Sequence, residues 1–308
     1  MNLQDALRDA ERGDARAQYS LGEKFYYGLD TALNYAEAAK WYQKAAEQGL
    51  SLAQNKLGYI YHEGLGVREN YQEAVKWYRK AAESGDADGQ NNLADMYVNG
   101  QGIARDYAEA VRLYLKAAEQ GNVKAMNHLG CRYYYGQGVE KDFAESERWY
   151  RKAAEHGDLA SQKTLAGIVS DKAEAFKWYR KAAGQGDIES LYKIGLQYEK
   201  GCGIRRNGAE AVRCFQKAAE LGNVAALTRL GMMYEYGEIV AKNYTEAAKW
   251  YRKAAEQWGT YAQEKLGYMY ENGLGVQQNF DEAERWYSAA CILGEETADP
   301  SLTVKTSA

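Results

Sequence analysis

The segment SLAQNKLGYIYHEGLGVRENYQEAVKWYRKAAESG, residues 51–85, decides the fold because its pattern returns along almost the whole chain. Its closing glycine recurs every 36 residues, apart from one shorter interval of 29 residues. A period of this length is typical of stacked structural repeats. Eight repeats are therefore predicted, marked by Gly13, Gly49, Gly85, Gly121, Gly157, Gly186, Gly222, Trp258 (beside Gly259) and Gly294.

Each repeat predicts two helices, here called helix A and helix B. In residues 51–85 the run GLGV at 64–67 ends helix A, because glycine accepts the positive φ of a helix C-terminus. Small and apolar residues recur on one face of each helix. They are Ala53, Leu57, Gly58 and Tyr61 in helix A, and Tyr71, Ala74, Trp77, Tyr78, Ala81 and Ala82 in helix B.

A tryptophan recurs at one position of helix B. Leu113 and Cys214 take this position in two repeats, so it has an apolar character throughout. An aromatic residue that recurs once per repeat is expected to pack in the core between helix pairs rather than to stack on a ligand. The tryptophans at this position are Trp41, Trp77, Trp149, Trp178, Trp250 and Trp286.

These motifs resemble the Sel-one-like repeat (SLR) family, whose members are relatives of the tetratricopeptide repeat proteins. The resemblance rests on Leu-Gly-x-x-Tyr in helix A, the Gly-x-Gly-Val turn, and Trp-Tyr-x-Lys-Ala-Ala in helix B. It implies an all-α fold, a right-handed α-solenoid of helix-turn-helix repeats whose A helices line a concave face. It also implies a role as an adaptor or scaffold for other proteins. Bacterial relatives act in signalling, host interaction and secretion.

The repeats leave no room for a second globular domain. Residues 1–12 are expected to form an N-terminal half-unit or cap, residues 13–294 the solenoid, and residues 295–308 a disordered C-terminal tail. The repeat at 157–185 lacks seven residues, including the tyrosine and the glycine turn. A short helix A and a tight turn are expected there, with a change in curvature and a weak joint between residues 1–156 and 186–294.

Composition narrows the classes of partner. The chain of 308 residues has 39 Lys and Arg against 43 Asp and Glu, and no basic stripe that would favour nucleic acid. No apolar run is long enough to span a membrane, and residues 1–14 do not resemble a secretory signal. A protein or peptide partner, no membrane insertion, a monomer and a cytoplasmic location are expected. A periplasmic or secreted protein whose signal was removed stays an alternative.

The cysteines do not form a repeating framework. Cys131, Cys202, Cys214 and Cys291 occupy four different repeat positions, so no disulfide set is predicted. Cys214 and Cys291 replace apolar residues and are expected to be buried thiols. The resemblance includes a secreted, cysteine-rich branch with reported penicillin-binding activity. The absence of its cysteine pairs weighs against hydrolysis of cell-wall or β-lactam substrates here.

The sequence offers little for catalysis. His62, His128 and His156 fall in different repeats, without metal-ligand spacing, and are expected to face solvent or the rim of the solenoid. No Gly-x-Ser-x-Gly elbow occurs, and the Gly-x-Gly-Val turns follow a helix and lack the lysine of a phosphate loop. No enzyme activity, metal or cofactor is therefore expected.

Positions of helix A outside the packing face give the candidate binding residues. Asn55, Asn91 and Asn127 share one repeat position and would form a row able to pair with an extended peptide backbone. Local polar contacts are the alternative. Acidic residues in the C-terminal half, such as Glu199 and Glu235, would favour a basic partner segment there. The remaining candidates are Tyr59, His62, Asp95, Tyr134, Tyr135, Tyr236 and Tyr268.

The leading function is a non-enzymatic scaffold that binds a partner protein or peptide in its concave groove. A regulator or immunity-type neutraliser of a bacterial toxin or secretion factor is a second hypothesis. The hydrolase suggested by the cysteine-rich branch is the third. Trp258, which replaces a glycine at an interhelical corner, is interpreted as a hydrophobic plug, with an exposed anchor as the alternative.

Overall fold

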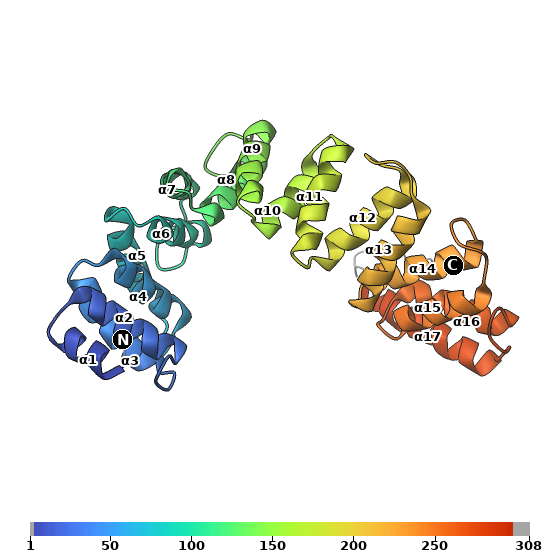
Figure 1. Ribbon diagram of the computed structural model, residues 1–308, viewed down its shortest axis with the longest axis horizontal. Helices are drawn as coiled ribbons and strands as arrows, with labels where there is room; N and C mark the ends of the chain where they lie inside the picture. Colours follow the sequence, from blue (N-terminus) through green and yellow to red (C-terminus); the bar gives the residue numbers. More distant parts are fainter. Residues whose placement is uncertain (1–2, 298–308) are drawn as a thin grey trace, which may run out of the picture. The chain divides into compact units, whose positions relative to one another are not determined.

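A computed structural model describes residues 3–297, and every regular element within them is an α-helix (Figure 1). The chain divides into two compact units, unit 1 (Met1–Leu165) and unit 2 (Ala166–Ala308), and the division falls inside the shortened repeat. The expected tail falls largely on residues 298–308, outside the described residues. The helices are α1 (Leu3–Glu11), α2 (Ala15–Tyr27), α3 (Tyr35–Glu47), α4 (Ser51–Glu63), α5 (Tyr71–Glu83), α6 (Ala87–Asn99), α7 (Tyr107–Glu119), α8 (Val123–Tyr135), α9 (Phe143–Glu155), α10 (Leu159–Ile168), α11 (Lys172–Gly184), α12 (Ile188–Lys200), α13 (Gly208–Glu220), α14 (Val224–Tyr236), α15 (Tyr244–Ala255), α16 (Thr260–Asn272) and α17 (Phe280–Thr297).

The predicted helix boundaries are confirmed by their capping residues. Helix α4 ends at Gly64, which adopts the left-handed conformation with φ 66°. Helix α5 begins after Asn70, whose side chain accepts a hydrogen bond from the Glu73 backbone N–H at 3.1 Å. A polar N-cap and a left-handed glycine C-cap together satisfy backbone groups that a helix leaves unpaired at its ends. The repeat therefore fixes where each helix starts and stops.

The helices of unit 1 pack in chain order, each helix A against the helix B that follows it. The Leu-Gly motif explains how closely they approach. A Cβ atom placed on Gly58 would lie 2.6 Å from Cδ1 of Tyr78 in α5, so glycine admits the tyrosine ring. The ring thereby reaches the core between the helices, where Tyr78 is buried beside Leu93 and Ala74.

The tryptophan position is a core position, as predicted. Trp41, Trp77, Trp149 and Trp178 are buried, and Trp250 and Trp286 are partly buried against the core of unit 2. At the four buried positions the lysine three residues later lies over the indole, with Nζ 4.2 Å from the ring centroid for Lys80 and Trp77. The lysine stem covers the ring while its charge stays near solvent, which accounts for the recurring Trp-Tyr-x-Lys motif.

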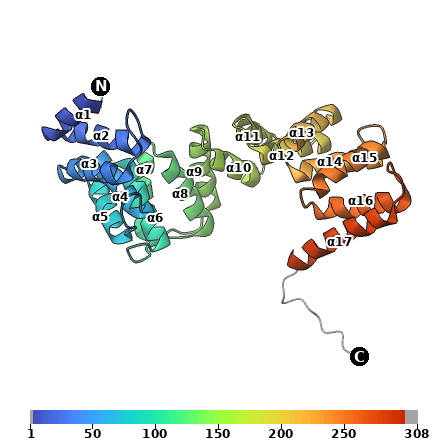
Figure 2. The same cartoon turned by 90° about the horizontal axis from the view of Figure 1, so that it is seen from below.

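Unit 2 repeats the same packing from α11 to α17, and Figure 2 shows α14 to α17 lying side by side. Its core contains Phe215, Leu230, Tyr251 and Leu266. The division between the units falls within α10, which spans only ten residues, and α11 begins at Lys172, capped by Asp171. The short helix and tight turn expected for this repeat are therefore present.

Two expectations about side-chain burial are wrong. Trp258 is 72% exposed and has φ 66°, so it is not a plug at its corner. Its backbone keeps a left-handed conformation, as the glycines at this position of other repeats do. Cys291 is exposed rather than buried, and Cys214 is half-buried. All four cysteines are free thiols.

Candidate partner-binding groove

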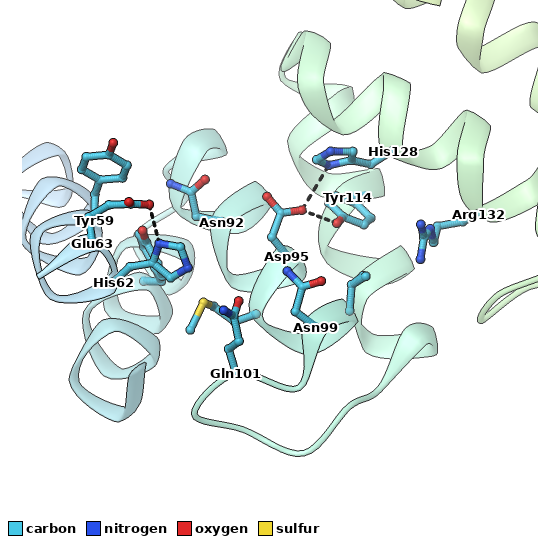
Figure 3. A pocket seen from close by; sticks show the side chains of 13 residues that line it. Tyr59, His62, Glu63, Asn92, Asp95, Asn99, Gln101, Tyr114, His128 and Arg132 are labelled. Carbon is cyan, nitrogen blue, oxygen red and sulfur yellow. Dashed lines mark hydrogen bonds and ion pairs between the residues drawn. The ribbon is translucent and has the colours of Figure 1, made fainter. Parts of the chain in front are cut away.

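Unit 1 contains a groove of about 520 Å³ across three successive A helices, α4, α6 and α8 (Figure 3). Tyr78 and Tyr114, from the intervening B helices, are buried and form its base. Tyr59 lies at the α4 end and Arg132 at the α8 end. We call this site the α4–α8 groove.

Asp95 organises the middle of the groove. The Tyr114 hydroxyl donates a hydrogen bond to its carboxylate, and Nδ1 of His128 lies 3.2 Å from the same oxygen. The amide of Asn91 donates to the other oxygen at 3.2 Å. Burial, reinforced by Asp95, raises the pKa of Tyr114, so the phenol stays a neutral donor. Asp95 thus accepts hydrogen bonds from Tyr114 and Asn91 and lies beside the His128 ring, while remaining partly exposed.

His128 is held in the neutral form. Its pKa is lowered, chiefly because burial penalises the imidazolium, although Asp95 acts in the opposite direction. Its Nδ1–H donates to Asn91 Oδ1 at 3.2 Å, and its ring packs against Tyr114 with centroids 4.9 Å apart. The sequence predicts that His128 faces solvent or the rim of the solenoid, and its side chain is indeed partly exposed along the groove. His128 also connects α8 to α6 through Asn91.

The α4 end of the groove is more open. Tyr59 is 39% exposed, and Nδ1 of His62 lies 2.8 Å from Oε1 of Glu63. Burial, with a smaller contribution from Glu63, raises the pKa of Tyr78 beneath them. This end therefore presents an aromatic surface with a carboxylate beside it.

The three asparagines do not form the free row that their register suggested. Asn91 is only 2% exposed, and its amide is bonded to Asp95 and His128. Asn55 accepts from Asn92 Nδ2 at 2.8 Å. Asn127 donates to Ser161 Oγ at 2.7 Å and Asp158 Oδ2 at 3.3 Å. Each amide therefore links one A helix to a neighbouring repeat, because stacked helices bring this position against the next polar side chain.

The acidic residues expected to attract a basic partner in the C-terminal half are already paired. Glu199 is nearly buried and accepts hydrogen bonds from Arg229 Nε and Nη2, the shortest at 2.6 Å. Glu235 accepts from Lys265 at 2.9 Å and from the Tyr251 hydroxyl at 2.6 Å. These internal partners neutralise both carboxylates. The expectation of a basic partner segment is not supported at these two residues.

The groove brings together Tyr59, His62 and Asp95 of the predicted binding residues. Tyr134 and Tyr135 lie further along α8 and pack edge-to-face on each other, with Tyr135 exposed. Tyr236 and Tyr268 are exposed on α14 and α16 of unit 2. The α4–α8 groove therefore contains only some of the binding residues that the sequence predicted.

Sequence reasoning missed Asn92, His128 and Arg132. Asn92 and His128 stand immediately before the repeat leucine, where other repeats have Lys56, Arg229 and Lys265. Polar residues recur there because the position faces the preceding A helix. That recurrence was visible in the sequence and marks an inter-repeat contact.

Two other features, a metal-ion site and a membrane-spanning helix, are not found among the described residues. Within residues 3–297 no group of three His, Cys, Asp or Glu side chains is arranged to hold a metal ion. None of the described helices is both long and apolar enough to cross a lipid bilayer.

Comparison with known proteins identifies the family. The Sel1 repeat model matches residues 15–50, 51–86, 87–122, 123–158, 164–187, 188–223, 224–257 and 260–295. The chain is 36% identical to c5321, a protective antigen of uropathogenic Escherichia coli with an SLR fold, with a TM-score of 0.86. That match covers 96% of this chain and 65% of the E. coli chain.

A Sel1 repeat protein from Oxalobacter formigenes is 30% identical, with a TM-score of 0.69, and the match covers 94% of this chain and 86% of that one. No curated protein matches the chain. Eight matched repeats cover most of the residues, and the same helix-pair packing runs through both units. The chain belongs to the Sel1 repeat family.

Proposed function

We propose that this protein is a non-catalytic scaffold that binds an extended segment of a partner protein in the α4–α8 groove. Sel1 repeat proteins generally act as protein-interaction scaffolds. The observation that carries the proposal is the groove itself, which spans three successive A helices and is lined by side chains from each. An extended segment suits a site built from a linear array of equivalent helices.

Internal hydrogen bonds position the centre of the groove. Asp95 accepts from Tyr114 and Asn91, so little side-chain freedom would be lost when a ligand contacts it. Tyr59 adds aromatic contact area of the kind enriched at binding hot spots. In this proposal Asn55, Asn91 and Asn127 act indirectly, by holding adjacent A helices in register.

The proposal includes a cytoplasmic location and no enzymatic activity. The four free cysteines support the location, because disulfides persist mainly in oxidising compartments. The pairing of titratable groups with one another in the groove supports the proposed lack of enzymatic activity.

The test is a displayed random-peptide library selected on the full chain. Bound peptides are then measured on Tyr59→Ala and on Tyr268→Ala, which alters the equivalent exposed tyrosine of the last repeat. Peptides that lose at least tenfold in affinity on Tyr59→Ala and keep it on Tyr268→Ala support the groove. Peptides that depend only on Tyr268, or on neither tyrosine, contradict it. Circular dichroism checks that both variants keep their helicity.

A further inference from the structure

Arg132 occupies a position that is apolar in several other repeats. Counted from the repeat leucine, its counterparts include Ile60, Met96, Met233 and Met269, and all four are buried. A guanidinium at such a position takes a charge partly out of water. That cost is normally offset by a carboxylate partner.

No such partner is present among the described residues. The contacts of Arg132 are a hydrogen bond from Nη2 to Cys131 Sγ at 3.3 Å and a stacking approach of 5.7 Å to the Tyr107 ring. Its Nε is buried and has no hydrogen-bond acceptor. It is the only cationic atom among the buried side-chain atoms without a partner in residues 3–297. A buried donor left unpaired is costly, so the site is incomplete without an acceptor.

Other cations at A-helix contacts between repeats are paired. Arg229 binds Glu199, and Lys265 binds Glu235. Lys24, at the same repeat position as Arg132, binds Asp30 at 2.6 Å. The contrast shows that this fold readily supplies an acid to such a cation, and that Arg132 lacks one while lining the groove.

We propose that Arg132 anchors an acidic side chain, Asp or Glu, of the partner segment bound in the α4–α8 groove. The inference rests on the proposed function and names the chemistry of its ligand. A planar guanidinium can bind a carboxylate with two parallel hydrogen bonds, and such a partner would offset the charge that this position takes partly out of water.

The charges of the groove also place the acidic residue of the bound segment. Glu63 at the α4 end and Asp95 in the middle repel a second acid, so the acidic residue lies at the α8 end and a neutral or basic residue lies near Tyr59. Tyr135, one turn beyond Arg132 on α8, is exposed and offers surface past the arginine. The segment can therefore continue beyond its anchor, which favours an internal side chain over a terminal carboxylate.

The direct test follows the Arg132 Nε–H signal by NMR in the full chain labelled with ¹⁵N-arginine. The probes are N-acetylglutamate methylamide and its neutral isostere N-acetylglutamine methylamide. Arg132→Met assigns the signal and copies the residue found at Met96. A saturable shift with the glutamate probe only, with a Kd of about 10–100 mM, is expected for one charge-assisted contact. No shift, or equal shifts with both probes, overturns the inference.

Library-selected peptides with blocked ends separate this inference from the groove proposal. The affinity of acidic peptides should fall at least tenfold on Arg132→Met, and equally on Glu→Gln or Asp→Asn in the peptide. As a control, Arg132→Met should stay folded or unfold at a higher urea concentration than the unaltered protein. Peptides that need Tyr59 but not Arg132 retain the groove and overturn the anchor. A shift with the glutamate probe without any Tyr59-dependent peptide retains the carboxylate site and overturns the groove. Preference for a free chain end over an internal acid refutes the side-chain assignment.

Discussion

Gly208 and Ile239 form a reversed pair. Glycine stands where most repeats have a large aromatic residue, and isoleucine stands where they have glycine. In most other repeats helix B begins with an aromatic residue, and the second glycine of the next turn packs on its backbone, as Gly102 does on Tyr71. Here helix B begins with Gly208, and the turn carries Ile239 instead of glycine. A Cβ on Gly208 would lie 2.6 Å from Ile239 Cγ2. One position became small where the other became large.

This pairing predicts coupled effects on stability. Gly208→Tyr alone should lower the free energy of unfolding of unit 2 by about 1–3 kcal/mol, because the new side chain overpacks against Ile239. Adding Ile239→Gly should recover most of the loss by restoring the usual pair. Urea unfolding followed by circular dichroism measures both variants. Simple addition of the two single effects would show that the residues are not coupled.

Trp77 is buried and Trp258 is exposed, and this contrast gives a second prediction about stability. Trp77→Ala should cost about 3–5 kcal/mol, because Trp77 is buried and its loss opens a cavity. Since repeats couple mainly to their neighbours, unit 1 should unfold first. Trp258→Gly should leave stability unchanged or raise it by up to about 1 kcal/mol, because glycine accepts φ 66° without strain. Equal losses in the two variants would refute this distinction.

The shortened repeat predicts a local weakness. It has lost the tyrosine and glycine turn that other repeats use for packing, and the division between the two units falls within it. Amide hydrogen exchange across residues 165–177 should therefore be faster than across the matching part of the second or third repeat. Equal protection would mean that the short turn is as stable as the regular one.

The lowered pKa of His128 predicts how the free energy of unfolding changes with pH. Its pKa in the folded protein is lowered from the usual value near 6.5, so the unfolded chain binds more protons as the solution becomes acidic. The stability that depends on neutral His128 is fully present above about pH 6.5. It is lost as the pH falls from there through the lowered pKa of His128 in the folded protein. Urea midpoints at pH 7.5 and pH 5.0 measure the loss. His128→Asn, which copies Asn92 of the preceding repeat, should reduce it, and an unchanged pH dependence would exclude His128 as its source.

The sequence was sufficient for the fold because every repeat restates the same local rules. Leu-Gly, the left-handed glycine turn and the tryptophan of helix B each act within one or two neighbouring helices, so periodicity alone predicts them. The groove was harder to predict. Register shows which residues share a face, but it does not show whether a side chain such as Asn91 is used by the next repeat or left for a partner.

The departures from the repeat were more informative than its regular positions. Arg132 stands among apolar counterparts, and this irregularity marks the groove better than the matched asparagines do. Trp258 was recognised as a departure, but the sequence does not display that its side chain is exposed.

The most direct measurement of the central claim is photo-crosslinking of a selected peptide to the full chain. A photoreactive phenylalanine analogue replaces Tyr59 or Asn99 in the α4–α8 groove, and Tyr236 or Tyr268 in unit 2 as matched controls. The groove account predicts crosslinks from Tyr59 and Asn99 that excess unlabelled peptide removes, and none from the two controls. Competed crosslinks from Tyr236 or Tyr268, with none from the groove, would contradict it.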